Sequence, residues 1–165
     1  MSALPPDLVP SIAAALLARG QRLGTAESCT GGMIAAACTD LAGSSQWFER
    51  GVVTYSNEAK TELLGVPAAL IAQHGAVSAE VAEQMALGLL SRAPVDWALS
   101  VTGIAGPTGG SPAKPVGTVW LALAQRGGPV QVWRELFSGD RAAVRAQTLA
   151  SGLTALLKAL QAGHP

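Results

Sequence analysis

The sequence predicts an α/β protein, specifically a three-layer α/β/α sandwich with a mixed, mostly parallel central sheet. Along the 165 residues, apolar segments with helical spacing alternate with shorter runs typical of buried strands. The last two expected strands, 116–124 and 130–137, flank a short glycine turn and should therefore pair antiparallel. Because neither a repeat nor a linker is evident, we expect residues 1–165 to form a single domain.

The first third of the chain predicts helices and strands in turn. The expected elements are a helix over 8–17, a strand over 22–27, a helix over 33–41 and a strand over 47–55. Gly20 suits the end of the first helix, because glycine readily adopts the left-handed conformation found there. Aromatic and β-branched residues favour a strand over 47–55.

The rest of the chain predicts helices on both sides of a buried strand and then the hairpin. The expected elements are helices over 57–64, 67–75 and 78–92, a strand over 97–101, the hairpin, and a helix over 140–160. Asn57 and Ser78 are suitable N-caps, because their side chains can accept hydrogen bonds from free amides of the first turn. Gly103–Gly117 is a long glycine- and proline-rich loop, and loops of this length in compact domains are usually functional.

Composition excludes several classes of protein. With 49% hydrophobic residues the chain is not disordered, and a net charge of zero offers no basic surface for nucleic acid. Its apolar runs are far shorter than the ~20 residues that span a bilayer, so we expect no membrane segment. Only 13% of residues are charged, which predicts that part of the surface is covered in a homodimer.

The N-terminus and the cysteines indicate the compartment. No basic residue precedes Arg19, which argues against a secretory signal. Cys29 and Cys38 form no disulfide framework and match no zinc spacing. We therefore expect a cytoplasmic protein without a structural metal.

Three polar segments, 27–32, 55–60 and 102–117, follow expected strands, where ligands bind in open α/β sheets. The first presents hydroxyls and amides at a helix N-terminus, which suits an anion as well as simple helix capping. The glycine loop matches neither a Walker A sequence nor the dinucleotide fingerprint. Lys60 is either a solvated helix residue or, if enclosed, a base whose pKa is lowered by desolvation.

Other residues allow both structural and functional interpretations. Cys29 at a helix N-terminus could be a nucleophilic thiolate or a small buried side chain. It lacks a nearby histidine, and the only candidate base within the fold, His74, lies at a predicted helix end. Arg141 and Arg145 lie one turn apart at the start of the last helix, where a cation does not complement the helix dipole. They suit a phosphate or carboxylate ligand, or surface ion pairs.

Taken together, these segments resemble the CinA C-terminal domain family over roughly residues 8–160. The residues that carry the resemblance are Ala26–Gly32 (AESCTGG), Ala42–Ser45 (AGSS), Trp47–Gly51 (WFERG), Thr54–Lys60 (TYSNEAK), Gln73–Ser78 (QHGAVS), Thr102–Pro107 (TGIAGP), Lys114–Val119 (KPVGTV) and Phe137–Arg141 (FSGDR). Several motifs in the right order are far more specific than any one of them.

The resemblance implies an amidohydrolase that converts nicotinamide mononucleotide to nicotinic acid mononucleotide and ammonia, with a Ser/Lys mechanism and without metal or other cofactor. It implies that Ser45 is the nucleophile and Lys60 the general base, and that Tyr55 and Ser28 complete the catalytic pocket. The residues that would bind the nucleotide are Thr30, Gly31, Gly32, Thr102, Gly103, Gly106, Arg141 and Arg145.

Two other functions remain open at this point. The same glycine loop and helix N-terminus suit a non-catalytic nucleotide-binding or competence-associated interaction protein. Hydrolysis that depends on Cys29 is the second, and it predicts inactivation by thiol alkylation.

Overall fold

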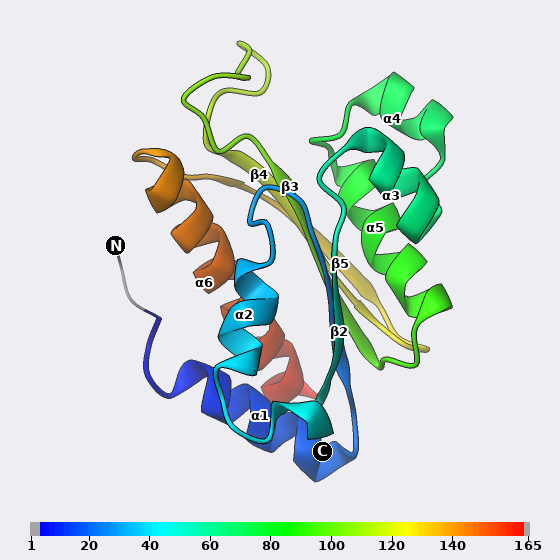
Figure 1. Cartoon of the computed structure of the whole chain (residues 1–165), viewed down its shortest axis with the longest axis vertical. Coiled ribbons are helices and arrows are strands. Elements are labelled where there is room, and N and C mark those ends of the chain that lie inside the picture. The colour runs from blue at the N-terminus through cyan, green and yellow to red at the C-terminus, as the bar shows by residue number, and fades with distance from the viewer. Residues whose placement is uncertain (1–3, 164–165) are drawn as a thin grey trace.

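The computed structural model describes residues 4–163 of the protein (Figure 1). Its elements are α1 (Leu8–Arg19), β1 (Leu23–Glu27), α2 (Met33–Thr39), the 3-10 turn η1 (Ser44–Gln46), β2 (Phe48–Val53), α3 (Asn57–Leu64), α4 (Ala68–His74), α5 (Ala79–Arg92), β3 (Trp97–Gly103), β4 (Thr118–Gln125), β5 (Val130–Leu136) and α6 (Arg141–Ala162). The predicted alternation of helices and strands and the final β4–β5 hairpin are both confirmed.

The strands form a mixed sheet in the order β2-β1-β3-β4-β5. β1 is parallel to both of its neighbours, β2 and β3, whereas β4 is antiparallel to β3 and to β5. Four of the five strands therefore point in one direction, although only two of the four neighbouring pairs are parallel. The connections between the parallel strands contain helices, because parallel pairing requires a long crossover.

Helices cover both faces of the sheet, which confirms the predicted three layers. α1, α2 and α6 lie on one face, and α3, α4 and α5 lie on the other (Figure 1). Alternate residues of β3 point to opposite faces: Leu99 and Val101 pack with α1 and α6, while Ala98 packs with α5. The two cores hold the strands rigidly, so the turns at their ends start from fixed positions.

Side-chain caps set the beginnings of three helices. Ser78 accepts a hydrogen bond from the Val81 amide at the start of α5, as predicted, and Asp140 caps α6 in the same way. At α3 the cap is Ser56, not the predicted Asn57, because the chain turns one residue earlier. Among residues 4–163, no helix combines the length and apolar character needed to cross a bilayer.

Candidate active site

The carboxyl ends of the three parallel strands meet at one edge of the sheet. Glu27, the last residue of β1, pairs with Val53 of β2 and Val101 of β3. The Thr54 amide continues this pairing with a 2.8 Å hydrogen bond to the Glu27 carbonyl, and the Ser28 amide donates to the Val101 carbonyl at 3.1 Å. The register therefore places the turn after β1 beside the turn after β2.

Lys60 joins these two turns from the first helical turns of α3. Its side chain is 1% exposed, and its Nζ lies 3.2 Å from the Ser28 Oγ. The same Nζ donates to the carbonyl oxygens of Thr54 and Tyr55 at 2.9 and 3.3 Å, so the chain between β2 and α3 wraps around the amine. A serine hydroxyl and a lysine amine are thus brought together across 32 residues.

Enclosure changes the acid–base behaviour of Lys60. Burial lowers its pKa below the ordinary value, because desolvation disfavours the ammonium form, and its interaction with Cys29 offsets this only in part. No carboxylate of the described residues forms an ion pair with the amine. A larger share of Lys60 is therefore neutral near pH 7 than of an exposed lysine, and a neutral amine can accept a proton.

A pocket of about 230 Å³ opens beside this pair and is called here the Ser28 pocket. Its lining includes six of the residues predicted for the site: Ser28, Tyr55, Lys60, Thr102, Gly103 and Arg141. Gly103 is required by close packing, since a Cβ there would lie 2.7 Å from the Val119 side chain and 3.2 Å from the Cys29 Sγ. Sequence reasoning did not identify four further lining residues: Asn57, Ala76, Val77 and Ala105.

The turn formed by residues 28–32 is called here the Ser28 turn. Hydrogen bonds to the Glu27 carboxylate hold it in place. This buried side chain accepts hydrogen bonds from the Thr30 hydroxyl at 2.6 Å and from the Ile34 and Ala35 amides at 2.9 Å each. It therefore fills the hydrogen-bonding demand at the start of α2. The sequence carried a signal for this role, an acidic residue at a strand end just before a helix, but the role was not predicted.

Ser45 does not join this group, which corrects the expected contact between Ser45 and Lys60. Ser45 is exposed in η1, before β2, whereas Lys60 follows β2. Because strands rise about 3.3 Å per residue, the six residues of β2 separate η1 from the start of α3 by roughly 20 Å. The serine that meets Lys60 is Ser28.

The two arginines at the start of α6 have different surroundings. Arg141 is exposed and lines the Ser28 pocket, where its guanidinium donates to the Gly106 carbonyl at 2.9 Å and lies 3.1 Å from the Tyr55 hydroxyl. Arg145 is half-buried behind the Ser28 turn and donates to the carbonyls of Cys29 and Thr30. Only Arg141 faces the space that a ligand would occupy.

Cys29 is a protonated thiol in this environment. Burial raises its pKa to about 11, outweighing the effects of its backbone hydrogen bond and of Arg145. A thiol is a far weaker nucleophile than a thiolate. The candidate base, His74, has its Nδ1 3.6 Å from the Glu80 carboxylate. The structure therefore favours the small buried role for Cys29.

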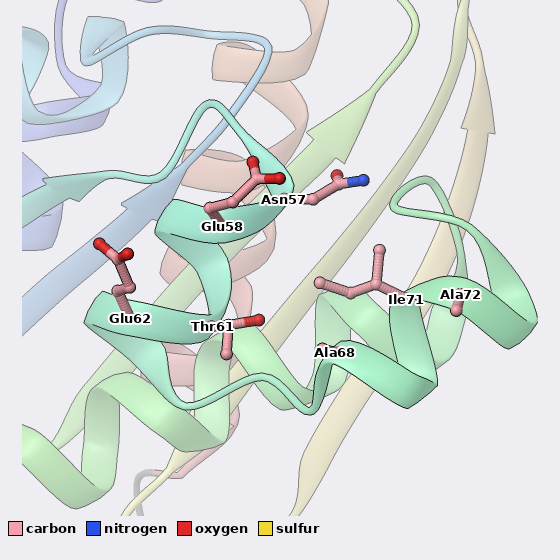
Figure 2. A pocket seen from close by; sticks show the side chains of 7 residues that line it. All are labelled: Asn57, Glu58, Thr61, Glu62, Ala68, Ile71 and Ala72. Carbon is pink, nitrogen blue, oxygen red and sulfur yellow. The ribbon is translucent and has the colours of Figure 1, made fainter.

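A second pocket, of about 380 Å³, lies between α3 and α4. Figure 2 shows that Glu58 and Glu62 line it from α3, while Ala68, Ile71 and Ala72 line it from α4. Its charged groups are carboxylates, and it contains no serine or lysine. An anionic ligand is therefore better served by the Ser28 pocket, which contains Lys60 and Arg141.

The residues described by the structure include no group of three or more His, Cys, Asp or Glu side chains arranged to hold a metal ion. Fold and site together define an α/β protein with a serine–lysine pair in a pocket at the carboxyl edge of its sheet. The chain belongs to the CinA C-terminal domain family, whose model matches residues 7–160.

Relatives and solved structures agree with this membership. The chain is 57% identical over 150 residues to the nicotinamide-nucleotide amidohydrolase PncC of Shigella flexneri, an alignment that covers 91% of each protein. It is 62% identical over 141 residues to a CinA-like protein of Citrifermentans bemidjiense, of which it covers 34%. The crystal structure of competence damage-inducible protein A from Klebsiella pneumoniae superposes with a TM-score of 0.91 and 43% identity, covering 96% of this chain and 98% of that one.

Proposed function

We propose that the protein is a nicotinamide-nucleotide amidohydrolase that hydrolyses the carboxamide of nicotinamide mononucleotide, with Ser28 as nucleophile and Lys60 as general base. The identity of 57% to a PncC enzyme over 91% of the chain supports the substrate. One observation carries the mechanism, namely the 3.2 Å approach of the Lys60 Nζ to the Ser28 Oγ in a buried site. This arrangement pairs a nucleophile with a base, as covalent catalysis requires.

Acylation begins with the neutral form of Lys60. Its two N–H bonds point to the carbonyls of Thr54 and Tyr55, which leaves the lone pair for the Ser28 hydroxyl proton. As Lys60 takes this proton, the Ser28 Oγ bonds to the carboxamide carbon and the C=O π electrons move to oxygen. The resulting oxyanion re-forms the carbonyl and breaks the C–N bond, and the Lys60 ammonium returns the proton to the departing ammonia.

Deacylation uses the same groups in the same order. Lys60, now neutral, takes a proton from a water molecule that attacks the Ser28 ester. Collapse of the second tetrahedral intermediate breaks the bond to the Ser28 Oγ, which regains its proton from Lys60. The balance is one water consumed, and one ammonia and one carboxylic acid released. Because Lys60 alternates between base and acid, its lowered pKa suits both half-reactions.

We assign the nucleotide part of the substrate to the exposed side of the pocket. Arg141 is the natural phosphate partner, because it lines the pocket and forms no ion pair with a carboxylate of the described residues. Tyr55 is 61% exposed and holds the Arg141 guanidinium through its hydroxyl. Thr102 and Gly103 form the opposite wall, where the Thr102 hydroxyl is bonded to the Ala76 carbonyl.

The test is ammonia release from nicotinamide mononucleotide by the purified protein, with and without a chelator. We expect one nicotinic acid mononucleotide per ammonia and the same rate with the chelator, since serine and lysine supply nucleophile and base. Binding without turnover would instead support a non-catalytic nucleotide-binding protein. A rate that falls with the chelator and returns with added metal would contradict the metal-independent mechanism.

A further inference from the structure

Arg145 makes an unusual connection between α6 and the nucleophile's turn. Its Nε donates to the Cys29 carbonyl and its Nη2 to the Thr30 carbonyl, at 3.1 Å each. These are consecutive backbone acceptors more than 110 residues away along the chain. No carboxylate of the described residues forms an ion pair with this guanidinium, so its contacts at the site are to the turn that follows Ser28.

The same turn contains a backbone amide, that of Thr30, without a partner among the described residues. In the part of the chain that the structure describes, the N–H group of Thr30, a buried residue, forms no hydrogen bond, whereas the Cys29 N–H bonds to its own thiol. The next amide, that of Gly31, is satisfied by the Ser28 carbonyl at 3.0 Å. Buried backbone N–H groups are nearly always paired, so an unpaired one two residues after a nucleophilic serine is available to a ligand oxygen.

The hydrogen bonds from Arg145 to backbone carbonyls determine the direction of the Thr30 N–H group. In a trans peptide the C=O and the following N–H point in opposite directions. Holding the Cys29 carbonyl toward α6 therefore directs the Thr30 N–H away from α6. Holding the Thr30 carbonyl likewise directs the Gly31 N–H, which is the one that closes the turn onto Ser28.

We propose that Arg145 is a positioning residue that holds the carbonyls of Cys29 and Thr30 and so presents the N–H group of Thr30 to the oxyanion formed when Ser28 attacks. The inference rests on the proposed function. It gives Arg145 a different role from the predicted phosphate contact, because two of its donor atoms are already engaged. It also explains the residue type, since a planar guanidinium can reach two adjacent acceptors whereas a lysine ammonium is a single point of charge.

Steady-state kinetics of Arg145→Ala and Arg145→Lys with nicotinamide mononucleotide test this role. A shift of about 1 Å in catalytic geometry costs roughly 100-fold in rate, so we expect kcat to fall by about that factor in both variants. KM should change little, because the turn and not the substrate loses its partner. Added guanidinium chloride at low concentration should restore part of the activity of Arg145→Ala but not of Arg145→Lys, whose cavity remains filled.

Two control variants separate positioning from binding and from general effects of lost charge. Arg141→Ala should raise KM, while Arg134→Ala removes an exposed arginine of β5 and should leave both constants unchanged. A raised KM with normal kcat for Arg145→Ala would mean that Arg145 binds substrate. Near-normal values of both constants would mean that Arg145 does not position the turn. Either result overturns the proposal. Loss of cooperative unfolding in both Arg145 variants also overturns it, in favour of a folding role.

The outcome for the wild-type protein separates this inference from the proposed function. If the wild type releases no ammonia, both fail together. If the wild type is active and Arg145→Ala is equally active, only the role of Arg145 fails.

Discussion

The two ends of β2 each carry a serine-containing turn, yet they offer opposite chemical environments. Before the strand, Ser45 lies exposed in η1. After the strand, the chain wraps around the buried amine of Lys60, and Ser28 arrives from β1 to lie 3.2 Å from it. Both serines belong to motifs of the same family resemblance, and that resemblance implied Ser45, not Ser28, as the nucleophile.

The difference shows that the reactivity of a serine hydroxyl depends on the groups around it, above all on a base within hydrogen-bonding distance. Ser28 gains a base because the parallel pairing of β1 with β2 aligns Glu27 with Val53, which places the two following turns side by side. Ser45 has the same hydroxyl but lies at the amino end of the sheet. Burial adds a second effect, because desolvation lowers the pKa of Lys60 and so increases its neutral fraction relative to an exposed lysine.

The largest expected effect is the loss of activity in Ser28→Ala, with Ser45→Ala as the comparison. Removing a nucleophile from a serine hydrolase costs roughly 10⁴- to 10⁶-fold in kcat, so Ser28→Ala should be almost inactive in the ammonia-release assay. Ser45→Ala should retain near-normal activity, and both variants should unfold at similar urea concentrations. The reverse order of activities would return the nucleophile to Ser45 and contradict the geometry.

The next effect concerns Lys60. Replacement by Met keeps much of the volume but removes the base, and a general base contributes about 10²- to 10⁴-fold, so kcat should fall by that range. In the wild type, the neutral fraction of Lys60 grows with pH. Therefore kcat/KM should rise with pH and level off above the lowered pKa, which lies below the ordinary value for lysine. Lys60→Met should lack this rise.

The same shift in pKa gives a signature in stability. Between the lowered pKa of folded Lys60 and the ordinary value of about 10.4, the unfolded chain binds a proton that the folded chain does not. The free energy of unfolding contributed by this group should therefore rise with pH through that window. Urea unfolding of wild type and Lys60→Met at several pH values measures the difference, and parallel pH profiles would mean that Lys60 keeps an ordinary pKa.

The smallest expected effect is a lower free energy of unfolding when Glu27, whose carboxylate holds the Ser28 turn, is replaced. In Glu27→Gln, an amide NH₂ would face one of the backbone amides that now donate to the carboxylate. An unsatisfied buried donor costs about 1–3 kcal/mol, which urea unfolding should detect as a lower free energy of unfolding. The exposed Glu58→Gln on α3 is the matched control. Equal stability of the two variants would show that the carboxylate is not needed to hold the turn.

The sequence alone determined most of the architecture. Helical spacing, capping residues and glycines at helix ends predicted the α-helices, and the short turn before Val130 predicted the antiparallel hairpin, whereas the 3-10 turn η1 was not predicted. The positions of the polar segments after strands also predicted the edge that holds the site, and the family resemblance implied that Ser28, Tyr55, Lys60 and Arg141 belong to it. These features are local or periodic, so they can be recognised without knowing which segments pair.

Only the tertiary structure decided which serine faces Lys60 and that Arg145 bonds to the Ser28 turn. Each of these contacts depends on the register between strands or on the packing of α6 against the sheet. Neither leaves a local pattern in the chain, because contacts between distant residues arise from how the two cores bury their side chains. Desolvation of Lys60 is likewise a property of the packed structure, since a lysine on an isolated helix would remain in water.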